Sequence, residues 1–184
     1  MGKFDFDRFN GFPRQSLNNL LLEDLWNHDV FNESDMHSAA YFYIRDYFRK
    51  QDRPGLYVRC EPQLMGMKPD IVVYEHGRPV YALEFKMYAK PGPLNEEAIF
   101  QDLDKLARLA EKIPSLRWGF FLMIYDDEES YTMSDQRLRR GGYEKVSVTA
   151  INARRTEETG RRRRGYDEWR ADFDRLQAAH REHS

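Results

Sequence analysis

Two stretches of sequence decide the fold: Lys68-Pro69-Asp70-Ile71-Val72-Val73-Tyr74 and, after a turn, Tyr81-Ala82-Leu83-Glu84-Phe85-Lys86. Both are rich in β-branched and aromatic residues, which favour extended strands. Between them, His76-Gly77-Arg78-Pro79 is typical of a turn, because Gly77 can take a positive φ without strain. The sequence therefore predicts a hairpin made of strands over residues 70–75 and 80–87.

The second strand of this hairpin carries charges inside an otherwise apolar run. Side chains alternate between the two faces of a strand, so Ala82, Glu84 and Lys86 share one face. Burying such charges costs free energy unless a partner or a metal ion compensates for them. The hairpin also brings Asp70, at the start of the first strand, beside Glu84. We therefore expect Asp70, Glu84 and Lys86 to form one cluster.

These residue types suit the hydrolysis of a phosphodiester bond. Two carboxylates can hold Mg²⁺, a hard cation that prefers oxygen ligands and keeps several waters. The metal polarises the phosphate and lowers the pKa of a bound water, while a lysine alongside orients or helps to deprotonate that water. Two plainer interpretations stay open: Asp70 simply begins a strand, and Glu84 and Lys86 are a solvated pair on an edge strand.

The rest of the chain predicts an α/β fold, a mixed sheet with helices packed on it. Apolar spacing predicts helices over residues 16–26, 32–50, 95–113, 130–140 and 165–181. Further strands are predicted over 56–64, 118–125 and 143–151, and the continuous apolar run 118–125 is typical of a central strand covered on both faces. In the helix over 32–50, Glu33 and His37 lie at the inward-facing edge.

Pro69-Asp70, thirteen intervening residues and then Glu84-Phe85-Lys86 resemble the signature of the PD-(D/E)xK superfamily of restriction-endonuclease-like nucleases. That family also places its Asp on one strand and its ExK on the next. The resemblance covers roughly residues 32–125, about half the chain, and implies a restriction-endonuclease-like αβββαβ core, which is the order predicted here. It implies one nuclease-like domain over residues 1–184, with its core at about 32–151 and a C-terminal helix at about 165–182.

The resemblance also implies roles for particular residues. The implied catalytic residues are Asp70, Glu84, Lys86, Glu33 and Gln101. The implied metal-binding positions are Asp70, Glu84 and Phe85, with Mg²⁺ as the cofactor and Mn²⁺ able to substitute. Glu33 could instead be a first-turn acid favoured by the helix dipole. His37 is expected to be a polar helix residue, and Gln101 and Lys105 could equally lie on a solvated helix face.

The net charge of the chain does not indicate a nucleic-acid partner, so only a local cluster of basic residues could do so. Lysine and arginine nearly balance aspartate and glutamate, giving a formal net charge of -2. Against that background the arginine run is the expected nucleic-acid contact, together with Lys105. The run comprises Arg161, Arg162, Arg163 and Arg164. A solvated loop is the alternative interpretation of these arginines.

Length and composition fit a single folded domain of 184 residues. The one cysteine, Cys60, excludes an internal disulfide and is expected to be a buried thiol. No apolar run is long enough to span a bilayer, so no membrane partner and a cytoplasmic location are expected. The leading hypothesis is a Mg²⁺-dependent nuclease acting on DNA, either an endonuclease or an exonuclease, and a homodimer if it cuts both strands. The alternative is a catalytically silent nuclease-fold module that binds nucleic acid or a protein.

Overall fold

A five-stranded mixed sheet forms the centre of the computed structural model, which describes residues 9, 11–27, 29–30, 32–51, 54–88, 94–125 and 143–153. The strands lie in chain order: β1 (Leu56–Cys60), β2 (Ile71–Glu75), β3 (Arg78–Tyr88), β4 (Trp118–Tyr125) and β5 (Val146–Asn152). Strands β1 to β3 pair antiparallel, whereas β3, β4 and β5 pair parallel. The predicted α/β class and mixed sheet are confirmed.

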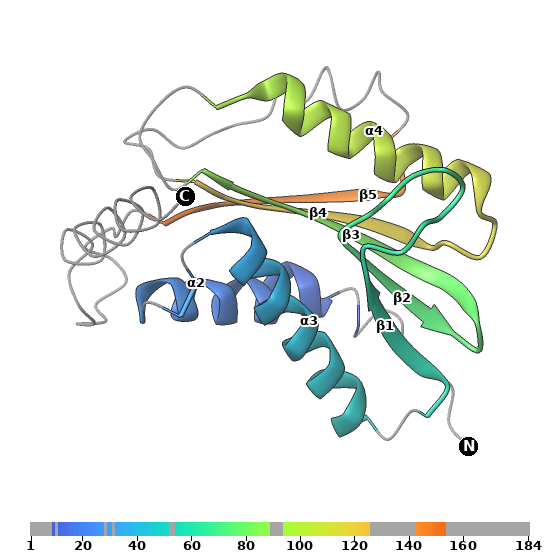
Figure 1. The fold of residues 1–184 in the computed structure, drawn as a ribbon, viewed down its shortest axis with the longest axis horizontal. Helices are drawn as coiled ribbons and strands as arrows, with labels where there is room; N and C mark the ends of the chain where they lie inside the picture. The colour runs from blue at the N-terminus through green and yellow to red at the C-terminus, as the bar shows by residue number, and fades with distance from the viewer. Residues whose placement is uncertain are drawn as a thin grey trace, which may run out of the picture.

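Helices cover both faces of this sheet (Figure 1). The helical elements are η1 (Phe12–Leu17, a π-helix), α2 (Asn18–Trp26), α3 (Glu33–Lys50) and α4 (Glu96–Lys112). α2 and α3 lie on one face, where Leu21 and Ile44 pack with Leu83, and α4 lies on the other, where Leu103 packs with Phe121. The β4 strand is therefore buried from both sides, as its apolar run predicts.

The predicted hairpin is present, with Ile71 of β2 opposite Leu83 of β3. His76 and Gly77 both take positive φ, 49° and 82°, in the turn that joins the two strands. Because the strands run antiparallel, the start of β2 lies beside the C-terminal half of β3. The hairpin thus brings the chain at Asp70 next to Glu84.

Two asparagine caps set the start of the helices that flank this hairpin. The Asn32 side chain accepts a hydrogen bond from the backbone N–H of Asp35 at 3.0 Å, and Asn95 accepts one from Ala98 at 3.1 Å. α4 then packs closely on the sheet at Gly119, where a Cβ atom would lie 3.0 Å from Leu106 Cβ. This close approach holds one face of α4 over β3 and β4.

The structure corrects several expected boundaries and one burial. Helical structure is already present at Phe9 and at residues 11–17, before the predicted start at residue 16, and Ser16 is exposed. β1 ends at Cys60 instead of residue 64, and Cys60 is exposed rather than buried. The element order from α3 to β4 is the predicted helix, three strands, helix and strand. The helices predicted at 130–140 and 165–182 lie outside the described residues.

Among the helices that the structure describes, none is long and apolar enough to cross a membrane.

Candidate active site

Asp70 anchors the cluster to the sheet. Its Oδ2 atom accepts a hydrogen bond from the backbone N–H of Phe85 at 2.8 Å. The same oxygen lies 3.3 Å from His37 Nε2, so α3 also reaches this carboxylate. Burial raises the pKa of Asp70, but the His37 contact and the Phe85 amide more than offset it and hold that pKa below its usual value. Asp70 is therefore ionised near neutral pH.

His37 and Asp70 stabilise each other's charged forms. Burial lowers the pKa of His37, but the 3.3 Å contact with Asp70 and the negative charge of that carboxylate outweigh burial and raise it. The sequence placed His37 on the inward edge of its helix without giving it a site role. The structure shows that it contacts an expected metal-binding carboxylate.

Glu84 is the most deeply buried acid of the cluster, with 1% of its surface exposed. Its Oε2 atom accepts a hydrogen bond from Lys105 Nζ at 2.8 Å, while Oε1 has no hydrogen-bond partner among the described residues. Burial, together with the negative charge of Asp70, raises the pKa of Glu84 to about 9. Ile71 pairs with Leu83 in the hairpin, so Asp70 lies beside Glu84, and its negative charge adds to burial in opposing ionisation of Glu84.

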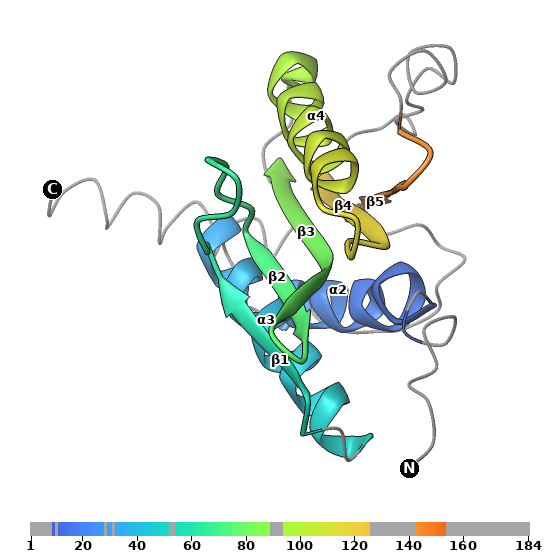
Figure 2. The same cartoon turned by 90° about the vertical axis from the view of Figure 1, so that its right-hand side faces the viewer.

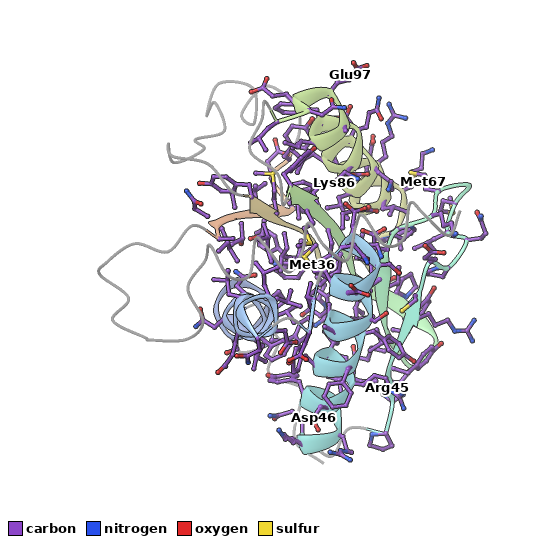
Figure 3. All side chains as sticks on the ribbon, turned by 60° about the vertical axis from the view of Figure 1, so that its left-hand side comes forward. Met36, Arg45, Asp46, Met67, Lys86 and Glu97 are labelled. Atoms are coloured by element: carbon purple, nitrogen blue, oxygen red, sulfur yellow. The ribbon has the colours of Figure 1, made fainter. Side chains whose placement is uncertain are left out.

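Lys86 lies on the same side of the sheet, between the start of α3 and α4 (Figure 3). Its Nζ atom is 3.0 Å from Asp102 Oδ2 and 3.6 Å from Glu33 Oε1. Burial lowers the pKa of Lys86, but the close contact with Asp102 and the negative charges of the surrounding acids raise it overall. Lys86 therefore carries its positive charge across the neutral range.

Asp102 links the two lysines of the cluster. Its Oδ1 atom lies 3.0 Å from Lys105 Nζ, and its Oδ2 atom lies 3.0 Å from Lys86 Nζ. Asp102 is only 8% exposed, and the two ammonium groups compensate for the burial of its charge. Burial lowers the pKa of Lys105, but Glu84 and Asp102 raise it overall. Lys105 thus belongs to the interior of the cluster.

Glu33 reaches the cluster from the first turn of α3. Besides its contact with Lys86, its Oε2 atom accepts a hydrogen bond from the backbone N–H of Met87 at 3.3 Å. Glu33 therefore ties α3 to the end of β3. The expectation that it points toward the other site residues agrees with these contacts, whereas any effect on a metal ion or a water stays a prediction.

Other expected residues are placed differently or are not described. Gln101 is exposed on α4, and its neighbour Asp102 points into the cluster instead. The Phe85 side chain is buried on the opposite face of the sheet, among the residues that pack against α3, so only its backbone could face a metal ion. Arg161, Arg162, Arg163 and Arg164 lie outside the described residues.

Asp102, like His37, is a residue of the cluster to which the sequence analysis gave no role. It falls on the buried stripe of α4, three residues after Ile99 and four before Leu106, and both of those side chains are fully buried. An acid at such a position is unusual unless it is paired. That spacing was the signal available in the sequence.

The oxygen-rich donor set fits a hard divalent cation. Asp70 and Glu84 supply carboxylates, Glu84 Oε1 is buried without a hydrogen-bond partner in the described ranges, and Mg²⁺ commonly keeps waters as its other ligands. No group of three or more histidine, cysteine, aspartate or glutamate side chains is placed to hold a metal by itself in this part of the chain. A metal here would depend on two carboxylates, backbone oxygen and water.

Comparison of the chain with protein-family models finds no matching model, and comparison with curated proteins finds no significant match.

Proposed function

We propose that this protein is a divalent-metal-dependent nuclease that hydrolyses phosphodiester bonds, with DNA as the expected substrate. The observation that carries the proposal is the pairing of buried Glu84 with Asp70 at one end of a hairpin. Placing a second carboxyl group beside an ionised one in a buried site costs free energy. A protein gains from such an arrangement when a cation binds there, and the resemblance to PD-(D/E)xK nucleases gives the cation a chemical purpose.

The proposed metal-binding groups are the Asp70 and Glu84 carboxylates and the backbone carbonyl of Phe85. When bound, Mg²⁺ or Mn²⁺ supplies a polarised phosphate and a bound water of lowered pKa. Asp70 is already held in place by the Phe85 N–H and by His37, so it needs little reorganisation to act as a ligand. Glu84 must lose a proton, because burial raises its pKa to about 9.

Lys86 has an electrostatic and orienting role in this proposal. Asp102 and Glu33 hold it in its protonated form, so it donates hydrogen bonds and does not accept a proton in this state. A protonated amine beside the scissile phosphate stabilises the negative charge that develops there. This argument favours orientation of the attacking water over its deprotonation by Lys86.

The experiment is a panel of single-stranded, double-stranded and branched DNA and RNA, incubated with Mg²⁺, Mn²⁺ or EDTA. Purified protein should cleave at least one substrate with metal and none with EDTA. Asp70→Ala, Glu84→Ala and Lys86→Ala should each lower the rate by at least about a hundredfold. The exposed Gln101→Ala variant is the comparison on the same side of the sheet, and we expect a smaller loss. Absence of cleavage of every substrate in the panel with Mn²⁺ would refute the proposal that the protein is a nuclease.

One contact favours the alternative of a catalytically silent module. Lys105 already supplies a positive charge to Glu84, at 2.8 Å, and could permanently take the place of a metal ion. Calorimetric titration with Mn²⁺ separates the two functions. A silent module would show no binding that depends on Glu84, whereas the proposed nuclease would lose Mn²⁺ affinity in Glu84→Gln. A cytoplasmic location and a homodimer that cuts both strands accompany the nuclease proposal.

A further inference from the structure

The face of the sheet that carries α4 has an open part at the edge strand β1. α4 packs on β3, β4 and β5, whereas β1 forms the edge of the sheet beyond β2 (Figure 2). On β1, Val58 packs into the core that contains Ile44 of α3, so its neighbours Tyr57 and Arg59 point to the α4 face by strand alternation. Tyr57 is 39% exposed, and Arg59 is exposed as well. An aromatic ring and a cation thus share one open surface.

Tyr57 is held in place by a second ring on the same face. It stacks on Tyr74, the residue opposite it on β2, at a centroid distance of 5.0 Å and an interplanar angle of 4°. Tyr74 in turn packs against the core cluster that contains Leu103 of α4. Tyr74 therefore covers one side of the Tyr57 ring, and the other side is directed toward the edge of the sheet. A ring fixed in this way loses little conformational freedom when a planar ligand stacks on its outer side.

Arg59 adds a positive charge to the stacked pair. Its guanidinium lies 5.7 Å and 6.0 Å from the centres of the two tyrosine rings, so cation–π attraction holds it beside both. Glu61, two residues along the chain, contacts Lys68 at 2.5 Å instead. Among the described residues, no acid forms an ion pair with Arg59. Its charge is therefore available to a phosphate group.

The proposed metal cluster lies on the same face of the sheet, since Glu84 contacts Lys105 of α4. Arg59 pairs with Val72 of β2, and Val72 pairs with Ala82 of β3. Ala82 is two residues before Glu84. At about 4.8 Å between strands and about 3.3 Å per residue, the Cα atoms of Arg59 and Glu84 lie roughly 12 Å apart. At about 3.4 Å per phosphate, a strand covers that distance in about four nucleotides.

We propose that Tyr57 and Arg59 bind an unpaired nucleotide of the substrate, with its base stacked on the outer side of the Tyr57 ring and a phosphate contacting the Arg59 guanidinium. Aromatic rings combined with cations bind single strands because every base has a flat π-face and every linkage a negative charge. The inference rests on the proposed nuclease function. It adds that the substrate carries a single-stranded segment within about four nucleotides of the cut.

The test measures binding in EDTA, so that cleavage does not affect it. The probe is a fluorescently labelled DNA single strand of about twelve nucleotides, within the size range of known single-strand sites. Tyr57→Leu keeps an apolar side chain but removes the ring, and should weaken binding by between about fivefold and a hundredfold, the effect of losing one stacked base. Tyr57→Phe keeps the ring and should bind as wild type does. Phe42→Leu is the matched control, because Phe42 is 63% exposed on α3, across the sheet from Tyr57.

Arg59→Gln tests the phosphate contact. Losing one phosphate contact to a single strand should reduce the slope of log affinity against log salt by about 0.7. Arg45→Gln is the matched control, because Arg45 is an exposed arginine of α3 that also lies over a tyrosine ring, that of Tyr41. The slope in Arg45→Gln should equal that of wild type. An unchanged slope in Arg59→Gln would overturn the phosphate contact.

A strand of equal length with abasic sites in place of its bases separates stacking from phosphate attraction. It keeps every phosphate, so Tyr57→Leu should bind it as wild type does, whereas Arg59→Gln should bind it more weakly. The stacking would be overturned by equal losses of Tyr57→Leu on the two strands, by wild-type affinity in Tyr57→Leu, or by an equal loss in Phe42→Leu. Thermal melts check that each variant folds. Failure of the nuclease proposal would appear separately, as Tyr57-dependent binding without cleavage of any substrate.

Discussion

Lys105 Nζ lies 2.8 Å from Glu84 Oε2, so a side chain of α4 supplies positive charge to a carboxyl group buried in β3. The same ammonium group contacts Asp102, which in turn contacts Lys86. Without a metal ion the proposed site is therefore held together by its own lysines. A divalent cation at Glu84 has to compete with Lys105, and Lys105 could contact a phosphate only after leaving that carboxylate.

Glu84→Gln should make the metal-free protein increasingly stable relative to wild type as pH rises. Glu84 has a folded-state pKa of about 9 and an ordinary value of 4.5, so between these values the folded protein keeps a proton that the unfolded chain releases. The wild type then loses up to about 1.4 kcal/mol of unfolding free energy per pH unit, a loss that glutamine cannot show. Urea unfolding in EDTA from pH 5 to 8 measures the difference.

Glu97→Gln is the control for that experiment, because it removes an exposed carboxyl group from the first turn of α4. If the free energies of unfolding of wild type and Glu84→Gln differ by a constant amount across the pH range, the Glu84 carboxyl group does not resist ionisation in the folded protein.

Added Mn²⁺ should stabilise the wild type but not Glu84→Gln, because only the wild type gains the second carboxylate ligand.

The Asp70–His37 pair should stabilise the fold within a limited pH window. The pKa of Asp70 is below its ordinary 3.8, so its contribution is present above that value and is lost as pH falls through the folded pKa. The pKa of His37 is above its ordinary 6.5, so its contribution is present below that value and is lost as pH rises through the folded pKa. His37→Asn should therefore lower the free energy of unfolding most between about pH 4 and 6.5, by on the order of 1 kcal/mol.

Thermal melts of wild type and His37→Asn at pH 5 and pH 8.5 test this window. The difference in melting temperature between wild type and His37→Asn should be larger at pH 5, where His37 is charged beside Asp70. Ser38→Ala, an exposed change on the next residue of α3, controls for effects on the helix. An equal gap at both pH values would mean that the 3.3 Å contact is not an ion pair in solution.

The hairpin and the caps of α3 and α4 could be predicted from local sequence, because turn glycine, strand alternation and asparagine caps act over a few residues. The start of the first helix could not. Serine is a common helix cap, which favours a start at Ser16, but burial of Phe12 and Leu17 in the core stabilises helical structure on the N-terminal side of this residue. Tertiary packing of these apolar side chains outweighs the local preference.

The candidate site shows the same division. Alternation along β3 placed Glu84 and Lys86 on one face, and the hairpin placed Asp70 beside them. The contacts of Asp102 and Lys105 depend on the position of α4 along β3. That position is fixed by packing such as that of Leu106 on Gly119. No short-range pattern in the sequence encodes that position.

Asp102→Asn should lower the cleavage rate between about tenfold and a hundredfold while leaving metal affinity nearly unchanged. The asparagine would keep the size of the side chain but lose the charge that holds Lys86, so the amine would be less well positioned at the phosphate. The pKa of Lys86 should fall, because Asp102 is what raises it most. The alkaline limb of the pH–rate profile should therefore move to lower pH, which a purely structural defect would not cause.

Asp104→Asn is the matched control, since Asp104 lies on the same helix but accepts its hydrogen bond from Tyr143. That variant should keep the wild-type pH–rate profile. If Asp102→Asn and Asp104→Asn behave alike, Asp102 contributes only to the stability of α4 and does not position Lys86.

Glu33→Gln should have a smaller effect than Asp102→Asn, with a loss of only a few-fold in rate. Glu33 Oε1 is 3.6 Å from Lys86 Nζ, compared with 3.0 Å for Asp102 Oδ2, and Glu33 is the more exposed of the two acids. Its charge therefore acts on Lys86 through more solvent screening. Glutamine can still accept the hydrogen bond from the Met87 N–H, so the junction of α3 with β3 should persist.

Single-turnover rates of Glu33→Gln and Asp102→Asn in saturating Mn²⁺ show which substitution slows cleavage more, and thermal melts check that both variants fold. A loss in Glu33→Gln that matches or exceeds the loss in Asp102→Asn would show that Glu33 acts on the metal ion or the attacking water directly.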